Sequence, residues 1–152
     1  MQGLLARPVL ASLALGGAAL MALAAQAAEI GQIKVSKGAV TVERGAQALP
    51  GNVGLRLEAS DVVRTGADGS AGITMADNSL LSVGPNSILA LERFDYEATT
   101  SQGRFDAQLQ RGTLAVVSGR IAKQSPQAMT VRTPSAALAV RGTEFVVAAQ
   151  GE

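Results

Sequence analysis

The chain has 152 residues, with 13 basic and 12 acidic side chains, a formal net charge of +1, and neither histidine nor cysteine. Without these two residue types it forms no imidazole base, no Ser-His-Asp triad, no thiol nucleophile and no thiolate zinc site. One Tyr, three Phe and no Trp in a nearly neutral chain offer no electrostatic footprint for nucleic acid and no aromatic platform for sugars. We therefore expect a protein that is not an enzyme and that uses no cofactor, metal or small-molecule substrate.

Residues 1–27 have the composition of a secretory signal peptide. Arg7 precedes an almost unbroken apolar run from Val9 to Ala25, and Ala25-Gln26-Ala27 supplies a small-x-small cleavage site. The alternative, an uncleaved membrane anchor, needs about 20 apolar residues and would exceed this run. We expect an N-terminal signal helix that directs the chain to the periplasm or to secretion and leaves no stable membrane anchor after cleavage. Residues 28–152 then form one domain with 12 basic and 12 acidic side chains.

The remainder of the chain alternates apolar and polar residues in short runs, which is the pattern of β-strands and not of amphipathic helices. The clearest run places Phe105, Ala107 and Leu109 on one face, with polar residues between them on the other. Arg111-Gly112 is interpreted as a turn that separates this strand from the next. The expected strands cover residues 30–35, 39–43, 61–65, 71–75, 80–83, 88–91, 105–110, 113–118, 129–133, 136–140 and 144–148.

Gly-, Asn- and Asp-rich turns separate these strands, and three of the turns share a weak repeat. Asp68–Ala71, Asp77–Leu80 and Pro85–Ile88 each run from turn residues through a serine to an apolar residue. Asp68 and Asp77 are interpreted as turn formers whose carboxylates accept hydrogen bonds from nearby backbone N–H groups, not as calcium ligands or catalytic acids. The fold class is all-β, with short antiparallel strands and tight turns. Both a β-solenoid-like stack and a twisted β-sandwich fit this spacing.

Three motifs follow one another along the chain: Asp61, Thr65 and Gly66, then Gly84, Pro85 and Ser87, then Thr133, Pro134, Val140, Arg141, Gly142, Thr143 and Phe145. With these motifs, the chain from about Gly31 to Val147 resembles the FecR protein domain. The resemblance implies a stand-alone periplasmic β-rich module for protein–protein interaction or envelope signalling, whose partner is another envelope protein. A carbohydrate- or peptidoglycan-associated envelope protein is the alternative.

The resemblance also implies what the motif residues do and where this chain departs from the family. The Arg141-Gly142-Thr143 turn is interpreted as a structural latch, and Pro134 as the end of a strand ladder, because proline lacks an N–H. Ser60 stands where the family commonly has glycine, so we expect the turn before Asp61 to be either strained or of another type. The chain ends at Glu152, whereas the family usually continues with another strand pair. The domain over 28–152 would then lack its last strands, and its final strand would be an exposed edge.

Overall fold

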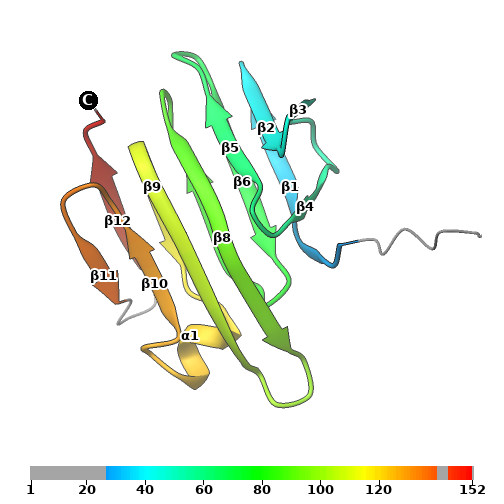
Figure 1. Ribbon diagram of the computed structural model, residues 1–152, viewed down its shortest axis with the longest axis vertical. Coiled ribbons are helices and arrows are strands. Elements are labelled where there is room, and N and C mark those ends of the chain that lie inside the picture. Colours follow the sequence, from blue (N-terminus) through cyan, green and yellow to red (C-terminus); the bar gives the residue numbers. More distant parts are fainter. Residues whose placement is uncertain (1–26, 140–143, 152) are drawn as a thin grey trace, which may run out of the picture.

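The computed structural model describes residues 27–139 and 144–151, and most of these residues lie in β-strands (Figure 1). The all-β fold class is confirmed, and each expected strand has a counterpart, while the expected signal helix lies outside the described residues. In chain order the elements are β1 (Glu29–Lys37), β2 (Val40–Arg44), β3 (Gln47–Pro50), β4 (Arg56–Glu58), β5 (Val62–Thr65), β6 (Ser70–Met75), β7 (Leu80–Val83), β8 (Ile88–Glu97), β9 (Gln102–Val117), α1 (Arg120–Gln124), β10 (Met129–Arg132), β11 (Ala137–Ala139) and β12 (Glu144–Ala149).

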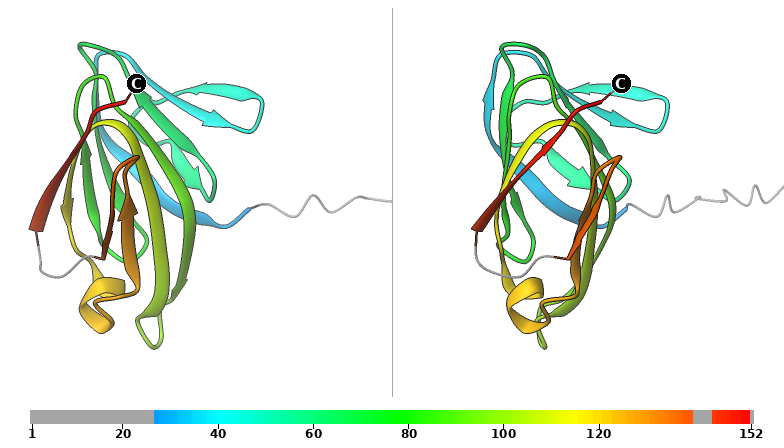
Figure 2. Two further views of the ribbon diagram at one scale, coloured as in Figure 1. Left: turned by 60° about the vertical axis from the view of Figure 1, so that its left-hand side comes forward. Right: turned by 90° about the vertical axis from the view of Figure 1, so that its left-hand side faces the viewer.

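The strands form two sheets that share β9 and curl toward each other as a half-barrel (Figure 2). The first sheet has the order β4-β1-β6-β7-β9-β12, and the second has the order β3-β2-β5-β8-β9-β10-β11. Neighbouring strands are antiparallel except β9 and β10, which are parallel. Two sheets that face each other across one core correspond to the twisted-sandwich alternative.

Strand β9 passes from one sheet to the other at Gly112. Its residues up to Arg111 pair with β8, and β10 lies on the other side of this half. Its residues from Gly112 onward pair with β7 and β12. Gly112 has a φ of +96°, and a Cβ there would lie 2.0 Å from Ser87 Oγ. The prediction of a turn at Arg111-Gly112 is therefore wrong: the glycine allows a bend within one continuous strand.

Three short elements were not expected from the sequence. β3 and β4 lie between the strands expected at residues 39–43 and 61–65, and α1 lies between those expected at 113–118 and 129–133. β3 and β4 exist because they add to the existing strands β2 and β1. β8 also continues beyond Leu91 to Glu97, where it pairs with the first half of β9.

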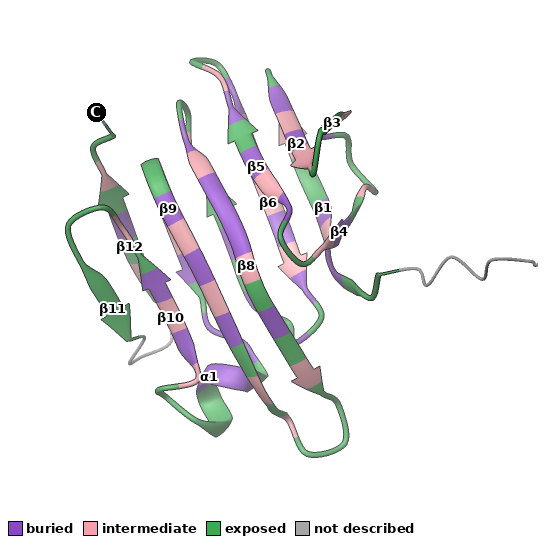
Figure 3. Ribbon diagram, in the orientation of Figure 1, coloured by how far each residue is buried: buried purple, intermediate pink, exposed green. Residues whose placement is uncertain are grey.

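The core lies between the sheets and is built from Val, Leu and Ile with few aromatic side chains. Along most strands buried residues alternate with exposed ones, as Figure 3 shows for the second sheet. Phe94 and Phe105 meet edge to face, with ring centroids 5.3 Å apart. α1 contributes Ile121 and Ala122 to the same core. Within the described ranges, no helix has the length and apolarity that a membrane crossing requires.

Candidate interaction surface

The outer face of the second sheet is charged, and four ion pairs lie on it. Arg104 and Asp106 pair along β9, and Arg93 and Asp95 pair along β8. Arg132 on β10 reaches Glu92, and Arg64 on β5 reaches Glu43 on the neighbouring β2. These exposed pairs contribute little to stability, but they keep this face hydrated.

The outer face of the first sheet differs, because its three central strands present no charged side chain. We call the outward residues of β6, β7 and the second half of β9, together with Val35 on β1 and Val146 on β12, the uncharged face. Leu80 is 45 % exposed and Val117, directly opposite it, is 37 % exposed. The outward residues of the central strands are Ser70, Gly72, Thr74, Leu80, Ser82, Thr113, Ala115 and Val117.

Cross-strand register brings the exposed valines of this face into one row. Val35 pairs with Gly72, Gly72 with Ser82, Ser82 with Ala115, and Ala115 with Val146. A shallow groove of about 360 Å³ lies at the β12 end of the row. Ala115, Val117, Phe145 and Val146 contribute to its walls, and so does Glu144, which pairs with Val117. The row is therefore apolar at both ends and built of small residues between them, a surface suited to close contact with another protein.

The strand β12 at the border of this face is an unusual sheet edge. β4 and β11 have only three residues each, and β3 ends at Pro50. β12 has six residues, contains neither proline nor a basic residue, and pairs with β9 in uninterrupted register. Short length, proline and charge are the devices that protect sheet edges from association, and β12 has only Glu144.

The second group of motif residues forms a buried polar network with Thr65. The Thr65 hydroxyl donates to the Gly84 carbonyl at 2.6 Å and accepts from the Ser87 N–H at 2.9 Å. Ser87 Oγ accepts from the Thr113 N–H at 3.0 Å, and the Gly84 N–H donates to the Thr113 carbonyl. Gly66 joins through its carbonyl, which accepts from the Asn86 N–H, while Pro85 is exposed on this turn. The network ties the ends of β5, β7 and β8 to the bend of β9.

Asp61 lies at the opposite end of β5 and is 1 % exposed. Its two carboxylate oxygens accept from Arg44 at 3.0 and 2.8 Å, and one of them also accepts from the Glu58 N–H at 2.9 Å. The hydrogen bond that Arg44 donates to Asp61 raises the pKa of Arg44. The preceding Ser60 has a φ of +74°, so the expected strain before Asp61 is present. Asp61 thus stabilises the turn that precedes β5, which is a structural role.

Of the two aspartates interpreted as turn formers, Asp77 accepts from a nearby backbone N–H as expected, whereas Asp68 accepts from one that is 29 residues away. Asp68 accepts from the Ala39 N–H, and Asp77 accepts from the Ser79 N–H at 3.0 Å. Asp77 also accepts from the Ile121 N–H at 3.2 Å, so it caps α1 from 44 residues away. No local pattern could identify this partner, because the contact depends on how the sheets fold.

The C-terminal motif is described only in part. Thr133 closes the turn between β10 and β11: its N–H donates to the Ala136 carbonyl at 2.8 Å, and its Oγ1 accepts from the Ala136 N–H. Pro134 follows the end of β10, as expected of a residue without an N–H. Phe145 lies on β12 and packs against the core. Val140, Arg141, Gly142 and Thr143 lie outside the described residues, so the latch interpretation stays a prediction.

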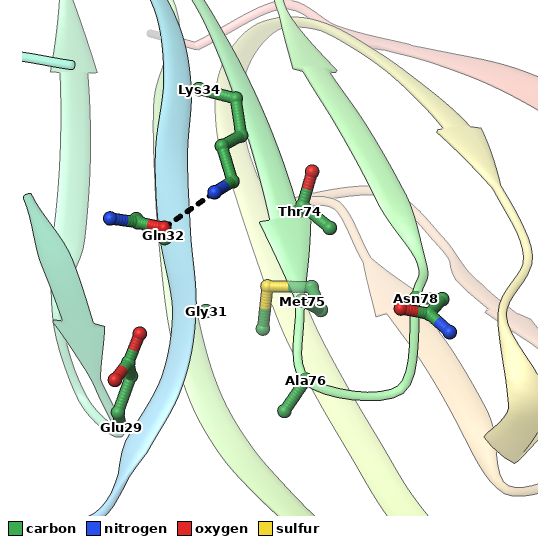
Figure 4. A pocket seen from close by; sticks show the side chains of 8 residues that line it. All are labelled: Glu29, Gly31, Gln32, Lys34, Thr74, Met75, Ala76 and Asn78. Atoms are coloured by element: carbon green, nitrogen blue, oxygen red, sulfur yellow. Dashed lines mark hydrogen bonds between the residues drawn. The ribbon is translucent and has the colours of Figure 1, made fainter. Parts of the chain in front are cut away.

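A polar hollow of about 360 Å³ lies over β1 and β6 (Figure 4). On β1, Lys34 donates to Gln32 Oε1 at 2.6 Å, while Glu29 pairs with Arg56. Thr74 and Asn78 line its other side, and Met75 packs where Gly31 leaves room. Its charges already have partners, and no three metal-ligating side chains of the kinds His, Cys, Asp or Glu gather in the described part of the chain. The hollow therefore has no evident chemistry.

Comparison with known proteins gives one match. A family model described as FecR protein matches residues 61–152, which is more than half of the chain. The match includes all three motifs but begins after the strands β1 to β4. No curated protein and no solved structure matches the chain.

Proposed function

Because the chain belongs to the FecR protein family, we propose that it is a non-enzymatic module that binds another protein of the cell envelope in a signalling pathway. FecR domains are signalling and regulatory modules of the periplasmic side of the envelope. The signal-peptide composition of residues 1–27 supports export of this chain, followed by cleavage. We therefore place the mature domain, residues 28–152, in the periplasm or outside the cell.

The observation that carries the proposal is the uncharged face. A solvated sheet face normally carries polar and charged side chains, as the second sheet does here. The first sheet instead exposes Leu80, Val117 and the two valines of the same face, and small residues between them let a partner approach closely. Depletion of charge at the centre of a surface is what distinguishes the core of a protein interface from the rest of a protein.

The test compares two charge substitutions that leave the core untouched. Leu80→Glu and Val117→Glu place a carboxylate on the uncharged face, and Gln110→Glu places one at an exposed position on the second sheet. We expect wild type and the Gln110→Glu control to retain a specific protein from periplasmic extract. The two face variants should lose it, because burying an unpaired charge at an interface is costly.

Three outcomes separate the alternatives. Equal retention by the face variants and wild type would place the binding surface elsewhere. Retention of wild type on purified peptidoglycan, without a protein partner, would favour the carbohydrate-associated alternative and contradict the proposal. A full-length chain that keeps residues 1–27, by mass spectrometry of the envelope fraction, would contradict cleavage.

A further inference from the structure

The outer side of β12 is a row of backbone hydrogen-bonding groups with no strand beside it in the described ranges. β9 covers one side of β12 along all six residues. Its side chains alternate, with Phe145, Val147 and Ala149 toward the core and Glu144, Val146 and Ala148 outward. Val146 is 74 % exposed, which is more than any other large apolar side chain among the described residues. An edge of this length and composition can pair with another strand.

We propose that a second copy of this chain pairs with β12, antiparallel and about a two-fold axis that passes through Val146. A two-fold axis normal to the sheet places outward side chains opposite outward side chains. The axis must therefore pass through one residue position and not midway between two neighbouring residues. Centred on Val146, this register places Val146 opposite Val146 of the second copy. It places Phe145 opposite Val147 of the second copy, an aromatic and β-branched pair of the kind that stabilises sheets.

Charge permits a second copy, and the self-complementary register favours it as the occupant. Residues 28–152 carry 12 basic and 12 acidic side chains, so two copies do not repel each other through net charge. Glu144 is the charged residue of β12, and in this register it lies opposite Ala148 of the second copy. The two Glu144 carboxylates are then about 13 Å apart along the strands, from a rise of about 3.3 Å per residue, which exceeds the Debye length of about 8 Å.

The second sheet offers a further contact on the same side of the molecule. β11 and β12 are the outermost strands of their sheets on the left of Figure 1, and Figure 2 turns this side toward the viewer. Leu138 on β11 pairs with the buried Val131 and so shares its inward face, yet it is exposed. A second copy along β12 would approach Leu138 as well. One strand pair is smaller than the standard interface of about 800 Å² per partner, so the dimer is expected to be reversible.

The absence of cysteine allows a sharp test of this register. In an exported chain with Val146→Cys, the single thiol would face its equivalent in the second copy. Directly opposite Cβ atoms lie about 4.5–5.5 Å apart, near the roughly 3.5–4.5 Å of a disulfide, so we expect oxidation to link Val146→Cys about ten-fold faster than the controls. The controls are Ala148→Cys, which this register places opposite Glu144, and Val53→Cys, exposed on a loop. Equal rates for the three variants would overturn the proposal.

Sedimentation velocity gives a second test without a covalent bond. The apparent mass of wild type should rise with concentration toward twice that of the monomer. Val146→Lys should remain a monomer, while Val35→Lys, on the same face but away from the edge, should behave as wild type. Circular dichroism confirms that each variant is folded. A wild-type protein that stays monomeric at every accessible concentration would overturn the dimer.

The dimer and the proposed function can fail separately. The dimer depends on the edge of β12, whereas partner binding depends on Leu80 and Val117; Val146 belongs to both surfaces, so Leu80→Glu is the variant that separates them. Val146→Lys should abolish dimerisation, and Leu80→Glu should leave it intact while it removes the envelope partner.

Discussion

Asp61 offers the most direct measurement of what a family motif residue contributes. The perturbation is a double-mutant cycle in which Asp61→Ala and Arg44→Ala are made singly and together. Removing Asp61 leaves Arg44 with Glu58 at 3.3 Å and the Arg56 carbonyl, and it leaves the Glu58 N–H without its acceptor. Removing Arg44 leaves a carboxylate that is 1 % exposed with one N–H donor among the described hydrogen bonds.

The expected magnitudes follow from this geometry. Breaking a fully buried ion pair costs about 3–5 kcal/mol, and because Arg44 is partly exposed we expect about 3 kcal/mol for each single substitution. The double substitution should cost less than the sum, with a coupling free energy of about 2 kcal/mol, because removing the second partner costs little once the first is gone.

Urea unfolding followed by circular dichroism measures these free energies. The Glu43–Arg64 pair is the matched control, since its side chains are 39 % and 44 % exposed and its coupling should not exceed about 1 kcal/mol. If the Asp61 and Arg44 substitutions were additive within about 0.5 kcal/mol, the ion pair would not hold this turn and the reasoning would fail.

Two further predictions concern backbone conformation, and both are read from thermal or urea unfolding. Gly112→Ala should cost at least about 2 kcal/mol, because the methyl group meets Ser87 Oγ, whereas Gly45→Ala, also at positive φ but with no neighbour within 4 Å, should cost about 1 kcal/mol; equal losses at the two sites would contradict the steric argument. Ser60→Gly should leave stability unchanged or raise it by up to about 1 kcal/mol, because relief of the strain at φ +74° offsets the added freedom of the unfolded chain; a clear loss would mean that the Ser60 side chain stabilises the turn.

The strands could be predicted from the sequence wherever alternation was strong. Phe105, Ala107 and Leu109 are buried as their spacing indicates. A local pattern cannot show whether a glycine ends a strand or bends it. Gly112 bends β9, because Ser87 contacts it and the residues that follow it pair with β7 and β12. The edge strands β3 and β4 have weak local signals and exist through pairing with distant residues.

The sequence identified the motif residues one by one, but which of them contact each other depends on the fold. Thr65 and Ser87 are 22 residues apart and meet only because β5 pairs with β8. Strain at Ser60 was one of the outcomes that could be predicted, because serine stands there at a position where the family commonly has glycine. The uncharged face could not be predicted, since it depends on which outward residues of β1, β7, β9 and β12 share a row, and therefore on register.

The path of β9 through both sheets affects how the protein unfolds. Its first half is hydrogen-bonded between β8 and β10, and its second half between β7 and β12. Opening either sheet would therefore release one half of β9, while the other half of β9 belongs to the other sheet. The two layers form a single cooperative unit, and the amide protons of β9 should be the last to exchange with solvent, long after those of the edge strands.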